Sequence, residues 1–412
     1  MELKPLSMNQ LKHSQPMGAH LAFLGVDGCM PLMHGAQGCA SFSKVFFTRH
    51  FCDPIAVQTT AVNDITAVID GGEYSIGEAI KNITQKVQPQ LIGLFTTGMT
   101  ETKGDDIKGV VRSFKDKRKI VYANTPDFEG GLESGWAKAV EAMIAQLVQP
   151  SPTKKEKKVL ILPHVSMSAY EVQQLKDALD SLGCQTYALP DMSTSMDGHL
   201  GLKQGALSSG GISVEQIENL GNSQAVISVG QSMKKCGEVF STLHNAKHFH
   251  FNALSGLQNC DDFYAQMLAY TQNEKPPQRV RQWRQRLQDA MLDTHFVMGS
   301  NKFVIALEPD QSYALEQAMS ECGAQCSIIA PQRSSHGYKV GDFEDIEDAL
   351  TQNDALVTNF HGHRICKENK KVHILRGFPN YEEIGNQLKS DILYEGTARL
   401  LFEVANAVKL RH

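Results

Sequence analysis

The chain has 412 residues, of which 42% are hydrophobic and 21% are charged, and its formal net charge is −5. This length favours two to four domains rather than one. The acidic balance gives no overall positive field of the kind that binds nucleic acid or anionic membranes. The longest apolar runs are strand-sized, so we expect no membrane span. The nine cysteines form no regular framework, which fits a reducing compartment, and we expect a cytoplasmic protein.

The first notable element is an apolar run at residues 21–26, followed by a glycine-rich turn that leads to Cys39. Gly35 and Gly38 allow the backbone to approach whatever the Cys39 sulfur contacts, because glycine has no Cβ. A thiolate in such a turn suits a soft metal or an iron–sulfur cluster. A cubane cluster needs four ligands, however, and no Cys-x-x-Cys pair is near. On spacing alone, a small buried cysteine that only packs is the commoner alternative, and Cys29 is interpreted in that way.

Short apolar segments then alternate with helical patterns along the chain. Strands are expected at residues 90–95, 119–123, 158–162 and 302–307, with a long loop at 191–211 and a long helix at 277–297. This alternation is typical of parallel α/β units. The Pro- and Lys-rich segment 149–156 is typical of a linker. We therefore predict three α/β domains, over residues 1–150, 151–300 and 301–412, with the long helix ending the second.

Two other clusters of polar residues invite a metal-binding interpretation. Asp289 and Asp293 are four residues apart and His295 follows, but three such side chains do not converge cleanly on a helix. A hydrogen-bond hub between domains is the preferred interpretation of these three. Cys322 and Cys326 are also four residues apart, and we expect them to share a helix face, but a metal site would need two further ligands. Neither Gly-x-Gly-x-x-Gly nor a P-loop occurs, so the usual phosphate anchors are missing.

Motifs along the whole chain resemble the nitrogenase component-1 family. They are His-Gly-Ala-Gln-Gly-Cys at 34–39, Arg-His-Phe at 49–51, the segment 91–101, Asn-Thr-Pro-Asp-Phe at 124–128, the segment 287–296 and Arg-Gly-Phe-Pro at 376–379. The family contains the catalytic α and β subunits of nitrogenase and the paired scaffold subunits that build the iron–molybdenum cofactor. The resemblance implies three Rossmann-like parallel α/β domains, and its details favour the β-type scaffold subunit.

The positions at which the chain departs from the cysteine pattern of a catalytic β subunit indicate its function. A catalytic β subunit resembling this chain would supply three cysteines to a P-cluster, at positions that here read Ser14, Cys39 and Gly98. A glycine side chain cannot bind iron, so a smaller cluster is expected. The resemblance implies a 4Fe–4S cluster at a subunit interface, with Cys39 as the metal ligand from this chain and three cysteines from an α-type partner. A catalytic β subunit and the scaffold of a vanadium-type system remain the alternatives, with a cluster-free α/β ligand-binding protein as a rival from another class.

Four further residues are expected at the cluster site, and none is expected to be catalytic. Gly38 precedes Cys39, and His34 would hydrogen-bond a cluster sulfide or Cys39, or else satisfy a buried backbone carbonyl. Thr97 and Gly98 follow a buried strand at the carboxyl edge, where open α/β sheets bind ligands. The acidic residues that come next would equally cap the following helix.

The resemblance also implies a set of partners. The chain would form a heterotetramer with the α-type subunit, two copies of each, and Arg49 and His50 would lie at the subunit interface. The interface cluster would relay electrons from the nitrogenase iron protein. A donor protein would deliver the iron–molybdenum cofactor precursor, and the partner subunit would hold most of it.

Overall fold

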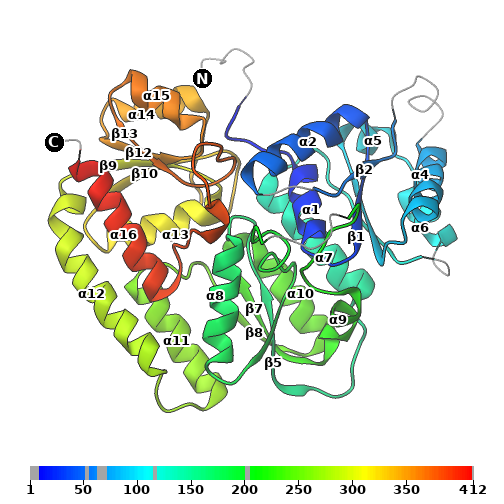
Figure 1. Ribbon diagram of the computed structural model, residues 1–412, viewed down its shortest axis with the longest axis horizontal. Coiled ribbons are helices and arrows are strands. Elements are labelled where there is room, and N and C mark those ends of the chain that lie inside the picture. The colour runs from blue at the N-terminus through cyan, green and yellow to red at the C-terminus, as the bar shows by residue number, and fades with distance from the viewer. Residues whose placement is uncertain (1–8, 52–54, 63–71, 115–117, 200–204, 411–412) are drawn as a thin grey trace.

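The computed structural model describes residues 9–51, 55–62, 72–114, 118–199 and 205–410. Its strands form three separate sheets with helices packed around each (Figure 1). Every strand pairing is parallel. The predicted α/β class with parallel sheets is therefore confirmed. Cys52 lies outside the described residues, and the domain boundaries near 150 and 300 remain predictions.

The first sheet has the strand order β2-β1-β3-β4. Its strands are β1 Cys29–His34, β2 Gln58–Thr59, β3 Leu91–Thr96 and β4 Ile120–Ala123. The helices around it are α1 Gln15–Leu24, α2 Gln37–His50, α4 Glu73–Lys86, α5 Gly98–Lys103, α6 Ile107–Phe114 and α7 Leu132–Leu147. All residues of β1 and β3 are buried, as expected for parallel strands that are covered on both faces. The apolar run at 21–26 begins inside α1 and does not form a strand.

The second sheet has the order β6-β5-β7-β8 and the third the order β11-β10-β9-β12-β13. The second comprises β5 Lys155–Leu162, β6 Gln185–Ala188, β7 Ser223–Val229 and β8 Lys247–Phe251, with α8 Ala169–Asp180, α9 Val214–Glu218, η1 Asn219–Asn222, η2 Gln231–Met233, α10 Lys234–His244, α11 Leu257–Thr271 and α12 Gln278–Gly299. The third comprises β9 Lys302–Ala306, β10 Gln325–Ala330, β11 Lys339–Val340, β12 Ala355–Thr358 and β13 Val372–Leu375, with α13 Pro309–Ser320, α14 Phe343–Leu350, α15 Gly362–Glu368, η3 Asn386–Leu388 and α16 Leu393–Lys409.

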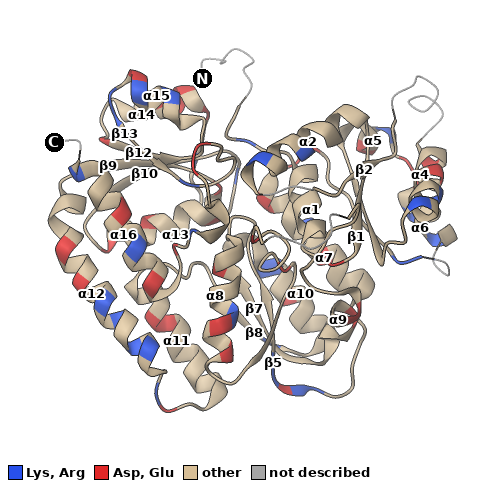
Figure 2. Cartoon of the chain, viewed as in Figure 1, with Lys and Arg blue, Asp and Glu red and all other residues tan. Residues whose placement is uncertain are grey.

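The long helix α12 joins the second and third sheets. It packs against α16 (Figure 1), and one continuous hydrophobic core contains residues of both sheets. Along α12 the basic residues lie in the first half of the helix and the acidic residues in the second (Figure 2). Two arginines of α12 pair with acidic residues of neighbouring helices: Arg284 Nη2 is 2.6 Å from Asp261 Oδ2, and Arg279 Nη2 is 3.2 Å from Glu395 Oε2.

Among the described residues, no helix is both long and apolar enough to cross a membrane.

Two predictions about polar clusters are wrong. Asp289, Asp293 and His295 are exposed on α12, and their side chains make no hydrogen bond or ion pair within the described residues, so they form no hub between domains. Cys322 follows the end of α13 and Cys326 lies in β10, so the two thiols do not share a helix face. Four-residue spacing indicates one face only where the helix continues across it.

Helices α1 and α7 approach each other at backbone contact distance because each presents a glycine. A Cβ on Gly135 would lie 1.9 Å from Gln15 O, and one on Gly18 would lie 2.0 Å from Leu132 O. We expect Gly135→Ala to lower the free energy of unfolding by about 2 kcal/mol, since neither backbone can yield without separating the helices. Gly77→Ala on α4 is the matched control, because a Cβ there meets no described atom within 4 Å. It should stabilise the chain by about 1 kcal/mol. Urea unfolding measures the free energy of unfolding of both variants, and equal changes would contradict the close packing of α1 against α7.

Candidate cluster-binding site

The predicted site residues lie at one edge of the first sheet. Strands β1 and β3 are neighbours, and the chain leaves β1 toward β2 on one side and β3 toward β4 on the other. Open α/β sheets bind ligands outside the carboxyl ends of strands at such a switch point. Cys39 follows β1 as the third residue of α2, and Gly98 follows β3 as the first residue of α5. The predicted glycine-rich turn is therefore shorter than expected, because Gly38 and Cys39 already belong to the helix.

Cys39 differs from the other cysteines in its exposure. Of the eight described cysteines, only Cys39 is exposed. Partial desolvation raises the pKa of its thiol, and the nearby Asp127 carboxylate raises it further. The thiolate is the form that binds metal, so metal binding at Cys39 must release a proton. Cys29 is fully buried at the start of β1 and belongs to the core.

Asp127 is a site residue that the sequence analysis did not single out, although it lies in the family motif at 124–128. Gly98 N–H donates to Asp127 Oδ2 at 3.2 Å. A Cβ on Gly98 would lie 3.4 Å from the same carboxylate oxygen. Burial raises the pKa of Asp127, and the Gly98 hydrogen bond opposes this rise. The available signal was its place after β4, the next strand along the same sheet edge.

Thr97 ties the two strand ends together. Its hydroxyl donates to His34 O at 3.1 Å, and a Cβ on Gly35 would lie 2.8 Å from Thr97 Cγ2. The close approach of Thr97 to the chain after β1 therefore requires a glycine at position 35. A Cβ on Gly38, by contrast, would meet no described atom within 4 Å. Gly38 therefore leaves open space beside Cys39 on the outer surface.

His34 is buried, and both of its ring nitrogens have hydrogen-bond partners within the chain. Its Nδ1 lies 2.9 Å from Thr60 Oγ1 and its Nε2 lies 2.9 Å from Asp105 Oδ2. Burial lowers the pKa of His34, and Asp105 opposes this. Its ring partners are therefore neither Cys39 nor a backbone carbonyl, the alternatives that the sequence left open. Of the acidic residues after Gly98, Asp106 caps α6 by accepting from Gly109 N–H at 2.9 Å, whereas Asp105 is bound to His34.

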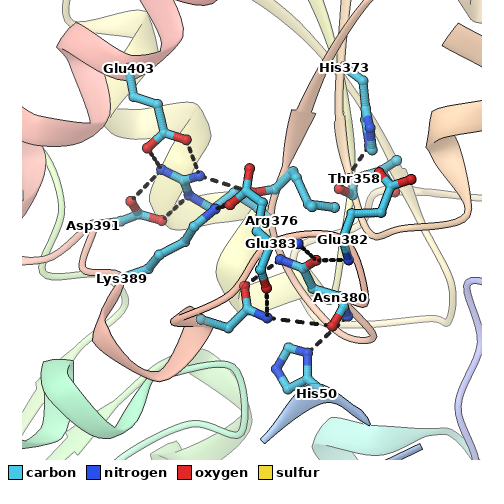
Figure 3. A network of polar contacts seen from close by, with 12 residues as sticks. His50, Thr358, His373, Arg376, Asn380, Glu382, Glu383, Lys389, Asp391 and Glu403 are labelled. Carbon is cyan, nitrogen blue, oxygen red and sulfur yellow. Dashed lines mark hydrogen bonds and ion pairs between the residues drawn. The ribbon is translucent and has the colours of Figure 1, made fainter. Parts of the chain in front are cut away.

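Arg49 and His50 make contacts within the chain, and their place at a subunit interface remains a prediction. His50 Nδ1 accepts from Asn380 N–H at 2.9 Å (Figure 3). The Arg49 guanidinium lies 4.3 Å from the centroid of the Tyr381 ring. Burial lowers the pKa of His50 to about 3, which keeps the ring neutral and able to accept. The end of α2 is therefore anchored to the segment after β13, more than 300 residues away.

Exposed apolar side chains accompany each segment of the site. Phe42 stands one turn after Cys39 and is 70% exposed, Met99 follows Gly98 and is 37% exposed, and Phe128 follows Asp127 and is 62% exposed. Single exposed apolar residues are ordinary, but several on converging segments indicate an interaction surface. We call Phe42, Met99 and Phe128 the apolar rim of the site.

The donor set decides which kind of metal group the chain fits. Within the described residues, no group of three or more His, Cys, Asp or Glu side chains is arranged to hold a metal ion. A cubane iron–sulfur cluster takes four thiolates, and Cys39 supplies one. The site fits a single ligand to a shared cluster, and it does not fit a cluster held by these residues alone.

Comparison with known proteins identifies the class. A model of the family described as nitrogenase component 1 type oxidoreductase matches residues 14–409, so the chain belongs to this family. The solved structure "Nitrogenase Cp1 at pH 6.5" superposes with a TM-score of 0.93 and 25% identity, over 100% of this chain and 95% of that one. The predicted three-unit Rossmann-like architecture is confirmed by this match.

Curated relatives narrow the class further. The chain is 38% identical to the nitrogenase iron-molybdenum cofactor biosynthesis protein NifN of Mesorhizobium japonicum, over 98% of this chain and 91% of the relative. It is 35% identical to NifN of a Nostoc species, over 98% and 93%. The NifN of Klebsiella pneumoniae is 34% identical, over 99% and 92%. The chain is thus similar to NifN proteins across nearly the whole length of both.

Proposed function

We propose that the chain is the β-type subunit of a scaffold on which the nitrogenase iron–molybdenum cofactor matures. It pairs with a NifE-like α-type subunit, two of each, and contributes Cys39 to a 4Fe–4S cluster shared across the interface. The NifN relatives, named for cofactor biosynthesis, support the scaffold role. The observation that carries the proposal is that Cys39 is the single exposed thiol among the described cysteines and lies at a sheet edge whose segments also carry the apolar rim. A lone ligand with an apolar surround requires a partner that supplies the remaining thiolates and covers the rim.

The chain's own residues bind and orient at this site. Cys39 lies in the first turn of α2, where backbone N–H groups favour the thiolate and oppose the rise in its pKa that burial and Asp127 cause. Thr97 and Gly35 hold the ends of β1 and β3 together, which fixes the start of α2 relative to α5. When bound, the cluster supplies one-electron transfer between the iron protein and the cofactor precursor. The precursor is held mainly by the partner, because Cys39 is the single exposed thiol among the described cysteines.

The catalytic β subunit is the main alternative, and the residues present disfavour it. Its larger cluster would need thiolates at the positions of Ser14 and Gly98. Gly98 has no side chain, and the space where a Cβ would stand is in contact with the Asp127 carboxylate. A thiolate beside a carboxylate would add a second negative charge at the same place, which costs electrostatic free energy.

The test of the proposed pairing is Phe42→Asp. A charge on the apolar rim would have to be buried without a partner when the α-type subunit docks. We expect the substituted chain to fold but to lose the NifE-like subunit on anaerobic co-purification, with affinity reduced by about 100-fold or more. Leu243→Asp is the control, because Leu243 is 55% exposed on α10, away from the rim. Retention of the partner by the Phe42 variant would contradict the proposed interface.

A further inference from the structure

The Asp127 carboxylate lies against Gly98, the position at which the resemblance implies a third cysteine in a catalytic β subunit. Its carboxylate accepts the Gly98 N–H at 3.2 Å, so it is fixed to the first residue of α5. A Cβ on Gly98 would make an ordinary van der Waals contact with Asp127 Oδ2 at 3.4 Å, so a longer side chain there would meet the carboxylate. The carboxylate thus lies next to the position at which the resemblance implies a cysteine in a catalytic β subunit.

Asp127 lies on the same sheet edge as Cys39, because its partner Gly98 follows β3, the strand next to β1, after which Cys39 stands. Asp127 is the charged group that raises the pKa of the Cys39 thiol. Within the described residues, no Lys, Arg or His forms an ion pair with it. Glu129, two residues further on, contrasts with it: its Oε2 is 3.1 Å from Lys138 Nζ. Burial of Asp127 also reduces the screening of its charge by water.

We propose that Asp127 is a second cluster-facing residue, which places an uncompensated negative charge beside the cluster bound at Cys39 and lowers its reduction potential. This inference rests on the proposed function, because it concerns the cluster to which Cys39 is a ligand. Net charge and hydrogen bonding around a cluster set the potential of iron–sulfur centres. A nearby negative charge disfavours the reduced, more negative state. Asp127 therefore acts on the cluster through its charge and does not bind iron. Cys39 remains the metal ligand from this chain.

The test is an anaerobic redox titration of the co-purified complex, followed by electron paramagnetic resonance, for wild type and Asp127→Asn. We expect unchanged iron content and a higher midpoint potential. At a fixed potential, the ratio of reduced to oxidised cluster should rise about tenfold, or about 59 mV for a one-electron couple. Glu129→Gln removes the same charge from the same loop and should leave the potential unchanged. An unshifted Asp127→Asn potential, an equal shift in both variants, or loss of iron in Asp127→Asn would overturn the proposal.

A second readout needs no cluster. In the cluster-free chain, alkylation of Cys39 reports its thiolate fraction, and Cys39→Ala gives the background from other thiols. Asp127→Asn should speed alkylation by about threefold or more, and Glu129→Gln should not. An unchanged rate in Asp127→Asn would show that the carboxylate does not face Cys39 and would overturn the inference. A complex without iron would instead refute the proposed function, and the alkylation rate would still decide where Asp127 points.

Discussion

Cys39→Ala is expected to remove the cluster from the complex of this chain with its α-type partner. One of the four thiolates of a shared 4Fe–4S cluster is lost, so iron content should fall to a small fraction of the wild-type value, and any residual cluster should be sensitive to oxygen. The chain should still fold, because Cys39 is exposed and its side chain is no part of the core. Iron per heterodimer and the electron paramagnetic resonance spectrum after reduction measure the effect.

Cys326→Ala is the matched control for this experiment. Cys326 is a partly buried thiol of β10 in the third sheet, and burial raises its pKa to about 12, which leaves it protonated. Iron content should be unchanged in this variant. Iron loss from Cys326→Ala, or full iron retention by Cys39→Ala, would show that the site has been misplaced.

Arg376→Ala is expected to lower the free energy of unfolding by about 3–5 kcal/mol, the cost of leaving the largely buried Asp391 carboxylate without its cation. The Arg376 side chain is 4% exposed and lies between two carboxylates (Figure 3). Its Nε is 2.9 Å from Asp391 Oδ2 and its Nη2 is 2.6 Å from Glu403 Oε2. Asp391 N–H in turn donates to Glu171 of α8 at 2.7 Å, so the loss should also loosen the contact between α8 and the segment before α16.

Chemical denaturation measures the Arg376 effect against Arg399→Ala. Arg399 is 64% exposed and pairs with Glu395 one turn away on α16. Exposed pairs of this kind contribute less than about 1 kcal/mol. Similar losses of unfolding free energy in the two variants would contradict the stabilising role expected for Arg376. The Arg-Gly-Phe-Pro motif at 376–379 is thus explained by stability, because Phe378 also packs against Phe47 and Phe51 of the first unit.

Local sequence signals predicted the α/β architecture, whereas the role of Cys39 as a metal ligand remains a prediction. Buried strands such as β1 and β3 are continuous apolar runs, so their class was readable without a structure. The rule that ligands bind at strand ends placed Thr97 and Gly98 at one sheet edge, and in the structure Cys39 lies at the same edge. Cys39 was identified only because the resemblance outweighed its ambiguous spacing.

The partners of the polar residues were not predictable, because they are distant in sequence. His34 binds Thr60 and Asp105, which are 26 and 71 residues away. His50 accepts from Asn380, 330 residues away. Leu11 lies in the core of the third sheet beside Val304, although it precedes the first sheet. Spacing and propensity describe one element at a time, and such contacts follow only from how the three units pack.

The most direct test of a shared cluster is the iron content of the complex purified anaerobically with the NifE-like subunit but without cofactor precursor. We expect about four iron atoms per heterodimer and a reduced 4Fe–4S signal, and we expect neither from this chain purified alone. About eight iron atoms per heterodimer would indicate the larger cluster of a catalytic β subunit. A complex without iron, or full iron loading of the isolated chain, would contradict a cluster shared through Cys39.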